Sequence, residues 1–282
     1  MGSGISNSTA FRRLRWTSQD VLVVVKTYPT PSAKHVETSC VAGVTRGSEW
    51  VRLYPVPFRL LETPFRRYQW ISVRLMRNLR DTRPESHRID PDSIVLGDCV
   101  GTSSDWAERW TLVKPLIAPS LEHLARMQKQ CGKSLGLVRV ADFDRLDITA
   151  HQNPMWSQRE LAKLRRDQLS LFPSCKPATL LQKVPYEFHY RFRCEGRTCA
   201  GHRMQILDWE IGQLYHNCVD RYGQDWEKPL RAKLGDELPL KDLHLFVGTH
   251  SRRRGQWMIV GLFYPKKMAD QEGRQMCLTF SK

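Results

Sequence analysis

The longest apolar runs in this sequence have the length of a strand. They are VLVVV at residues 21–25 and MIVGLFY at residues 258–264, and runs of this size fit buried strands. A membrane helix needs about 20 apolar residues, and the start of the chain lacks the apolar core of a secretory signal. We therefore expect a globular, intracellular protein of the cytoplasm, with its eight cysteines present as reduced thiols.

The composition is that of a folded chain with an excess of positive charge. Hydrophobic residues make up 41% and charged residues 26% of the 282 residues, which is the balance of a globular protein. Lys and Arg number 44 against 29 Asp and Glu, so the net charge is +15. Such an excess attracts polyanions, and nucleic acid, DNA or RNA, can use many cationic contacts. We expect nucleic-acid binding; a scaffold that meets an acidic protein partner is an alternative.

The first part of the chain is predicted to be a β-rich domain over residues 20–150, after a disordered leader at 1–19. Two strands, near residues 50–54 and 70–75, each alternate an aliphatic face with a face of arginine and tryptophan. A small half-open sheet or barrel that meets a polyanion would show this pattern. An ordinary sheet whose arginines cover its solvent face would show it too. On the first interpretation, the nucleic-acid contacts of these strands are Trp50, Arg52, Trp70 and Arg74.

A basic linker is predicted at residues 151–180, and a mixed domain at 181–282. The linker contains a helical piece with Lys163, Arg165 and Arg166, which either lies along phosphates or is an exposed helix with internal ion pairs. The mixed domain is expected to hold a Cys/His loop, a long helix and a β-hairpin. The predicted tip of that hairpin carries Arg252, Arg253 and Arg254. The fold class is therefore α+β, with a β-rich domain, barrel-like in one form, before a mixed α/β domain.

The stretch RFRCEGRTCAGHRMQILDWE at residues 191–210 is the strongest candidate for a site. Cys194 and Cys199 are separated by four residues, and His202 follows three positions later. Two thiolates and an imidazole at this spacing can surround one ion, and zinc completes a tetrahedral set with a fourth ligand. The ion would hold the loop in place, with Arg191, Arg193 and Arg197 presented to nucleic acid.

The fourth ligand is predicted to be Cys218. A helix that begins near Asp208 places Cys218 on the same inward face as Ile211, but the same spacing also describes an ordinary core thiol. An iron–sulfur cluster is a less favoured cofactor, since Cys-x4-Cys occurs in some cluster spacings. A loop that binds no metal is the remaining alternative.

An acidic pair follows the loop. Asp208 and Glu210, beside His202, are the candidate catalytic groups of a metal-dependent nuclease or related hydrolase that acts on nucleic acid. The competing interpretation is structural, because Asp208 is a natural helix N-cap and Glu210 falls in the first turn, where the helix dipole favours negative charge. We favour the structural interpretation, and the sequence leaves open whether the protein is an enzyme.

Overall fold

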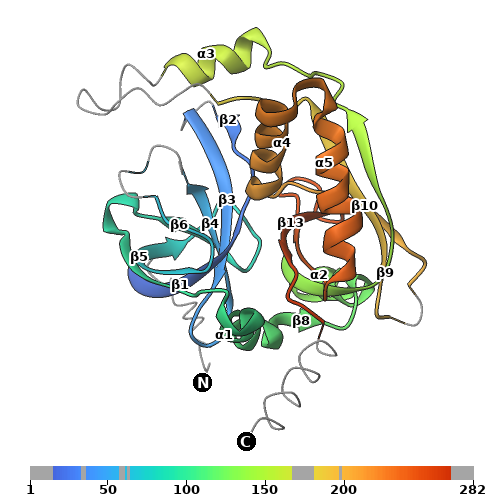
Figure 1. The fold of residues 1–282 in the computed structure, drawn as a ribbon. Coiled ribbons are helices and arrows are strands. Elements are labelled where there is room, and N and C mark those ends of the chain that lie inside the picture. Colours follow the sequence, from blue (N-terminus) through green and yellow to red (C-terminus); the bar gives the residue numbers. More distant parts are fainter. Residues whose placement is uncertain are drawn as a thin grey trace, which may run out of the picture.

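The protein folds as a barrel joined to a second, helix-covered sheet. The computed structural model describes residues 15–32, 36–56, 61, 64–166, 181–196 and 199–267. The barrel lies to one side in Figure 1 and the second sheet, with α4 and α5 in front of it, to the other. The predicted α+β class, with a barrel-forming N-terminal part and a mixed C-terminal part that holds a Cys/His cluster, is confirmed.

The barrel has five strands, and it closes because its first strand pairs with two neighbours. The hydrogen-bonded order is β1-β3-β4-β6-β5, and β1 pairs with β5 as well as with β3. The short strands β2 and β7 pair with β3 and β5 outside this ring. The bounds are β1 Thr17–Lys26, β2 Thr30–Ser32, β3 Val36–Val44, β4 Trp50–Val56, β5 Gln69–Arg77, β6 Ser86–Ile89 and β7 Val95–Cys99. Since β1 begins at Thr17, the predicted leader extends three residues too far.

The unbroken apolar run in β1 has a simple cause. Val21 and Val23 point into the barrel, where they pack against Ile71. Their neighbours Leu22 and Val24 point outward and are also buried, because that face packs on the second part of the molecule. A strand that is buried on both faces has no position for polar residues.

The second sheet is built around one long strand. The order is β11-β10-β9-β12-β13, with β8 parallel to β9. The first half of β9 pairs with β12 and the second half with β10. The segment 118–150, which the sequence prediction assigns to the β-rich domain, therefore contributes its strands to this sheet. The bounds are β8 Ile117–Ala118, β9 Leu135–Ala150, β10 Tyr186–Cys194, β11 His202–Gln205, β12 His244–Thr249 and β13 Trp257–Phe263.

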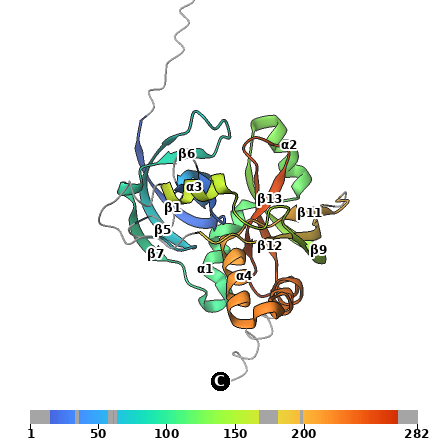
Figure 2. The ribbon, with the colours of Figure 1, turned by 90° about the horizontal axis from the view of Figure 1, so that it is seen from above.

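Helices cover the inner face of this sheet. Phe188, Tyr190 and Phe192 on β10 pack in one core with Tyr215 of α4 and Leu230 of α5. The third helix, α3, lies above one end of the barrel, as Figures 1 and 2 show. The helices are α1 Ser103–Val113, α2 Leu121–Cys131, α3 Gln158–Arg166, α4 Trp209–Tyr222 and α5 Glu227–Arg231. Shorter helical turns span Pro91–Ser93, Lys114–Leu116, Gly223–Trp226, Ala232–Glu237 and Leu238–Leu240.

The barrel and the second sheet share a buried polar network. Arg52 is only 2% exposed and donates hydrogen bonds to the Ser134 carbonyl at 3.0 Å and to the Cys40 sulfur at 2.9 Å. Glu85 accepts from both the backbone N–H and the hydroxyl of Ser134, each at 2.8 Å. The prediction that Arg52 meets nucleic acid is wrong, because the barrel face that carries it is covered by the second sheet.

Three other predicted contact residues of the barrel have different surroundings. Trp50 is half-buried and meets Phe246 edge-on at 6.0 Å between ring centroids. Trp70 is half-buried beneath the Arg46 guanidinium, 4.3 Å from the ring centroid. Arg74 is exposed and forms an ion pair with Asp90. Among the helices in the part of the chain described here, none has the length and apolar character needed to cross a membrane.

Candidate metal centre

Four side chains from three elements converge at one end of the β10–β11 hairpin. Cys194 ends β10, His202 begins β11, Cys199 lies in the loop between them, and Glu122 comes from the first turn of α2. One potential ligand atom from each residue lies within 4.8 Å of all the others. The Nε2 of His202 is 3.2 Å from the Cys199 sulfur and 3.2 Å from a Glu122 oxygen. The Cys194 sulfur is 3.6 Å from that nitrogen and 3.4 Å from the other Glu122 oxygen.

Local backbone geometry brings the loop onto α2. Gly201 has a φ of +97°, a conformation that glycine adopts without strain. A Cβ at Gly196 would lie 2.9 Å from the Cβ of Ser120, so only glycine permits this close approach. Ser120 is the N-cap of α2 and accepts a hydrogen bond from the His123 backbone N–H at 3.1 Å. The cap fixes the first turn of α2 and thereby the position of Glu122.

The protonation of the cluster responds to its own neighbours. Burial, together with the adjacent Cys199 thiol, raises the pKa of Cys194 to about 11. Partial burial alone would raise the pKa of Glu122, but it lies below its usual range because the residue's own backbone N–H, Ser120 and Cys194 donate to the carboxylate. A bound cation would stabilise both thiolates, so metal binding would release protons.

The donor set fits a closed metal site. Thiolate, imidazole and carboxylate are all established zinc ligands, and four protein ligands make a structural site without an open position. Iron–sulfur clusters are held by four cysteines, or by two cysteines and two histidines, whereas this group offers two thiols and one imidazole. The group can therefore hold a single metal ion and is compatible with zinc.

Cys218 lies outside this group, and the fourth potential ligand is Glu122. Cys218 is 5% exposed on α4 and packs in the core with Ile211 and Tyr215, as the alternative interpretation of its spacing predicts. Glu122 precedes Cys194 by 72 residues, and nothing in the pattern around the loop indicates that α2 lies beside it. The tertiary fold alone reveals this ligand.

The acidic pair Asp208 and Glu210 links the two parts of the molecule. One oxygen of Asp208 accepts from the Glu210 backbone N–H at 2.7 Å, which caps α4. The other accepts from the Leu262 backbone N–H and from the Arg67 guanidinium, both at 3.1 Å. The same Arg67 nitrogen contacts Glu210 at 2.7 Å. Burial raises the pKa of Asp208, while Arg67 opposes that shift. Both oxygens of Asp208 are engaged and its side chain is 1% exposed, so Asp208 is the N-cap of α4 that the structural interpretation predicts, whereas the Glu210 side chain is 50% exposed.

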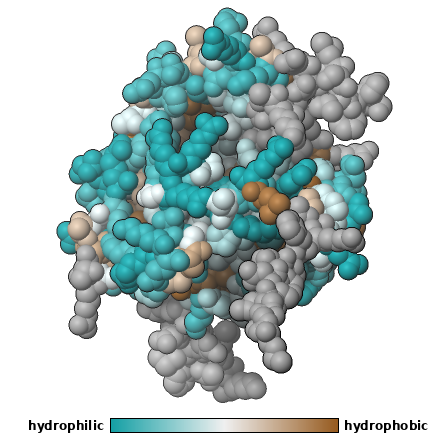
Figure 3. All heavy atoms as spheres, turned by 180° about the vertical axis from the view of Figure 1, so that it is seen from behind, coloured by the Kyte–Doolittle hydropathy of each residue, from teal (hydrophilic) through white to brown (hydrophobic). Residues whose placement is uncertain are grey.

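The predicted arginines of β10 lie on the outer face of the second sheet. Arg191 shares Asp147 with Arg145 and Arg203, at 2.8–3.1 Å. These three guanidiniums hold the pKa of Asp147 well below its usual range despite the opposing effect of burial. Arg193 is exposed one step further along β10. Figure 3 views the molecule from behind and shows a largely hydrophilic face with small apolar patches.

The remaining predicted cations are spread over the molecule. Arg252, Arg253 and Arg254 are exposed at the turn between β12 and β13, which pair as an antiparallel hairpin. Lys163 is half-buried on α3. Arg197 and the side chains of Arg165 and Arg166 lie outside the described residues.

Together these features define a class of protein: a small barrel fused to a second sheet that carries a group of four side chains able to hold a metal ion. Residues 118–279 match the family described as a domain of unknown function, DUF8757, and residues 17–115 match a second such domain, DUF8758. The first match covers more than half of the chain, which therefore belongs to the DUF8757 family. The two matches meet just before β8, so one corresponds to the barrel with α1 and the other to the second sheet. A search among curated proteins found no match to the sequence.

Proposed function

We propose that the protein binds nucleic acid through a basic surface at the β12–β13 turn, and that a structural zinc ion orders the adjoining sheet and α2. The surface, called here the tip patch, comprises Arg80, Lys133, Arg252, Arg253 and Arg254. Its residues come from three segments that are distant in sequence. Arg80 lies in the turn between β5 and β6, Lys133 follows α2, and the three arginines form the hairpin turn.

Buried hydrogen bonds hold these three segments together. The Thr249 backbone N–H donates to the Ser134 carbonyl at 3.0 Å. The Arg83 guanidinium, three residues after Arg80, donates to the Thr249 carbonyl at 2.7 Å. Each cation of the patch is therefore anchored within a few residues of one shared network.

The charge balance of the patch carries the proposal. In the three described segments 78–83, 131–134 and 250–256, the one acidic residue is Asp81, and the buried Arg83 engages it at 2.6 Å. The cations of the tip patch therefore have no carboxylate partner within these segments. The pKa of His250 is lowered chiefly by burial, and the adjacent positive charges of Arg253, Arg83 and Arg252 lower it further. Nucleic-acid backbones bind surfaces of this kind.

Zinc is proposed for the metal centre because its ligands combine two thiols, an imidazole and a carboxylate in one closed group. Zinc binding needs reduced cysteines, and the six described cysteines are free thiols. A cytoplasmic location, where thiols stay reduced, fits this chemistry.

The decisive experiment measures the salt dependence of binding. Fluorescence anisotropy of the full chain with labelled single-stranded and duplex oligonucleotides, between 50 and 200 mM salt, should give an affinity that falls steeply as salt rises. In duplex DNA each lost phosphate contact lowers the magnitude of the slope of log K against log salt by about 0.9. The triple variant R252Q/R253Q/R254Q should therefore lose up to about 2.7 from the slope.

A matched control removes the same charge elsewhere. R221Q/K228Q/K233Q takes three cations from α4, α5 and the adjoining helical turn, and should leave the slope nearly unchanged. Equal binding by the two triple variants would refute the tip patch. If no oligonucleotide bound at 50 mM salt, the proposal would fail and an acidic protein partner would become the better explanation of the charge.

A further inference from the structure

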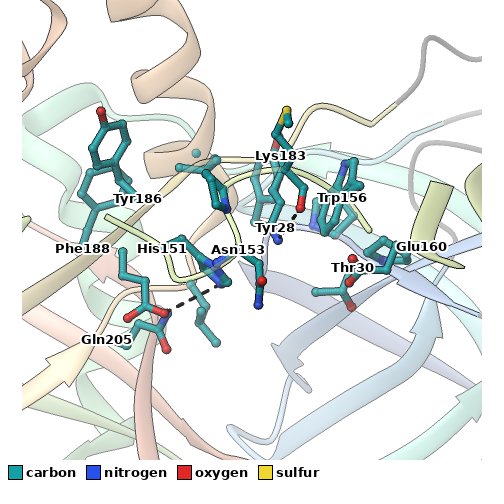
Figure 4. A pocket seen from close by; sticks show the side chains of 18 of the residues that line it. Tyr28, Thr30, His151, Asn153, Trp156, Glu160, Lys183, Tyr186, Phe188 and Gln205 are labelled. Atoms are coloured by element: carbon teal, nitrogen blue, oxygen red, sulfur yellow. Dashed lines mark hydrogen bonds and ion pairs between the residues drawn. The ribbon is translucent and has the colours of Figure 1, made fainter. Parts of the chain in front are cut away.

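A wide cleft separates the barrel from the second sheet on the side of α3, away from the metal centre. Its volume is about 890 Å³, within the range of small-molecule sites. It is lined by β2, the chain from residue 151 to α3, the start of β10, the end of β11 and the first turn of α4. Figure 4 shows Tyr28, Lys183 and Trp156 on one side of it and His151 and Gln205 on the other. Neither the proposed nucleic-acid surface nor the metal centre uses this cleft.

Fixed aromatic side chains form part of the cleft wall. The Tyr28 hydroxyl lies 2.8 Å from the Gln182 carbonyl and 2.9 Å from Nε2 of His216. The Trp156 indole N–H donates to the Leu181 carbonyl at 2.7 Å. A Cβ at Gly212 would fall 2.2 Å from the Tyr28 ring, so glycine at this position lets α4 press against the tyrosine. Aromatic walls held in this way are suited to a planar ring.

The rim of the cleft carries three cations, two of which have no hydrogen bond or ion pair with any described residue. Arg159 and Lys163 form no hydrogen bond or ion pair with any described residue, and both line the cleft. Lys183 lies 4.8 Å from the centroid of the Trp156 ring and donates to the Met155 carbonyl at 3.3 Å. Three cationic side chains thus surround the opening beside the aromatic wall.

The carboxylates of the cleft are, in contrast, engaged by the protein. Glu160 accepts from the Ser157 backbone N–H at 2.8 Å and from its hydroxyl at 2.7 Å. Glu187 faces the His151 Nε2 at 3.9 Å. Asp208 accepts a hydrogen bond from Arg67 and is the N-cap of α4. An anion that enters the cleft would therefore meet Arg159 and Lys163, while Glu160 and Asp208 are held by hydrogen bonds within the protein.

Polar groups suited to the edge of a heterocycle also line the cleft. Asn153 and Gln205 supply amide groups, which both donate and accept hydrogen bonds. His151 is oriented by the Asn153 backbone N–H, which donates to its Nδ1 at 2.9 Å. A ligand with a flat, hydrogen-bonding ring and a negatively charged group would use every part of this lining.

We propose that the cleft binds a nucleoside phosphate, with the base against the aromatic wall and the phosphate at Lys163 and Lys183. The nucleotide is either free or one unstacked unit of a single strand, since the chemistry of recognition is the same for both. This binding goes beyond the proposed role of the tip patch and does not require it, because the two sites share no residue.

Calorimetric titration of the full chain tests the proposal with three probes: adenosine 5′-monophosphate, adenosine, and ribose 5-phosphate. The monophosphate should bind at least about tenfold more tightly than either fragment, because each fragment lacks one half of the recognition. The variant K163Q/K183Q should weaken its binding by at least about tenfold, since each cation makes a charge-assisted contact with the phosphate. K228Q, on the exposed surface of α5, is the matched control and should bind as the wild type does. Unchanged melting temperatures of the variants show that they are folded.

A single-stranded oligonucleotide distinguishes the two sources of the nucleotide. If the oligonucleotide binds, the monophosphate does not, and K163Q/K183Q selectively weakens the oligonucleotide, the ligand is a unit of a strand and the cleft is supported. If K163Q/K183Q and K228Q bind the probes equally, the proposal is overturned. It is overturned as well if neither the monophosphate nor the oligonucleotide binds. The variant R252Q/R253Q/R254Q should bind the monophosphate normally, so that the failure of the tip patch and that of the cleft are told apart.

Discussion

At the scale of single residues, two of the arginines are buried between the barrel and the second sheet and are not accessible to a partner. Arg52 and Arg83 are 2% and 6% exposed, and each donates to a backbone carbonyl of the second sheet. Alternation along a strand places Arg52 correctly on the outer face of the barrel. It cannot tell that this face is covered, because periodicity describes one strand and not what packs on it. The arginines of the β12–β13 turn, in contrast, are exposed.

The ion pair of Asp81 with Arg83 predicts a specific pH dependence. Hydrogen bonds from Arg83 and Ser86 outweigh the effect of burial and lower the pKa of Asp81 to about 2, against 3.8 for an unperturbed aspartate. The folded state therefore holds the proton less tightly than the unfolded state. The stabilisation is present above about pH 4 and is lost as the pH falls towards 2.

D81N should accordingly lower the free energy of unfolding at pH 7 by about 2–3 kcal/mol. It should also make that free energy less sensitive to pH between 4.5 and 3. Urea unfolding across this range measures both effects, with D236N, which removes an exposed carboxyl group, as the control. A D81N slope that equals the wild-type slope would contradict the prediction.

At the scale of elements, the candidate metal centre lies where a hairpin meets a helix. The loop spacing identifies Cys194, Cys199 and His202 from sequence, because all three residues lie within nine positions. Periodicity also locates α4, its cap at Asp208 and the β12–β13 hairpin, because these depend on short-range signals. Glu122 could not be found in this way. It belongs to α2, whose sequence pattern predicts a helix but not that the helix packs beside the Cys/His loop. The contact between Glu122 and the loop is a result of tertiary packing.

If Glu122 is the fourth ligand, three variants should differ in how they bind zinc. Metal analysis after dialysis against a weak chelator should find one zinc per chain in the wild type and in C218A. C199A should lose the ion, and E122Q should lose at least about tenfold in affinity, because each removes a ligand of a four-coordinate site. If C218A lost zinc and E122Q kept it, Cys218 would be the ligand and the observed cluster would not be the metal site.

At the scale of the whole molecule, the barrel and the second sheet share an interface of apolar and polar contacts. The apolar contacts of β1 with β9 and β12 and the polar contacts around Ser134 and Arg67 all cross the boundary between the two family matches. The predicted division of the chain into separate domains does not include these contacts. It is inferred from local sequence patterns, which carry no information on contacts between distant segments. An isolated barrel would expose Leu22 and Val24 to water.

Arg67 is the residue through which this coupling is best tested. Its side chain is 5% exposed, it pairs with the 1% exposed Asp208, and it donates to the Leu262 carbonyl at 2.5 Å. R67M should lower the free energy of unfolding by about 3–5 kcal/mol, because it leaves a buried carboxylate without its partner. K233M breaks an exposed pair on a helical surface and should cost no more than about 0.5 kcal/mol. Unfolding in guanidinium chloride measures the free energy of unfolding of both variants. If R67M lowers it by less than about 1 kcal/mol, the contacts of Arg67 are not needed to hold the two parts together.

The placement of α2 has a consequence for how the chain would respond to metal loss. The helix has eleven residues and is about 16 Å long. Its second residue is the candidate ligand Glu122, and Lys133 of the tip patch follows two residues after its end at Cys131. A chelator, or an oxidant that acts on the thiols, would release the N-terminal end of α2 from the Cys/His loop. A movement of the helix would then displace Lys133 beyond its C-terminal end. If the chain binds zinc and nucleic acid as we propose, its affinity for nucleic acid would therefore depend on the redox state and metal content of a separate site.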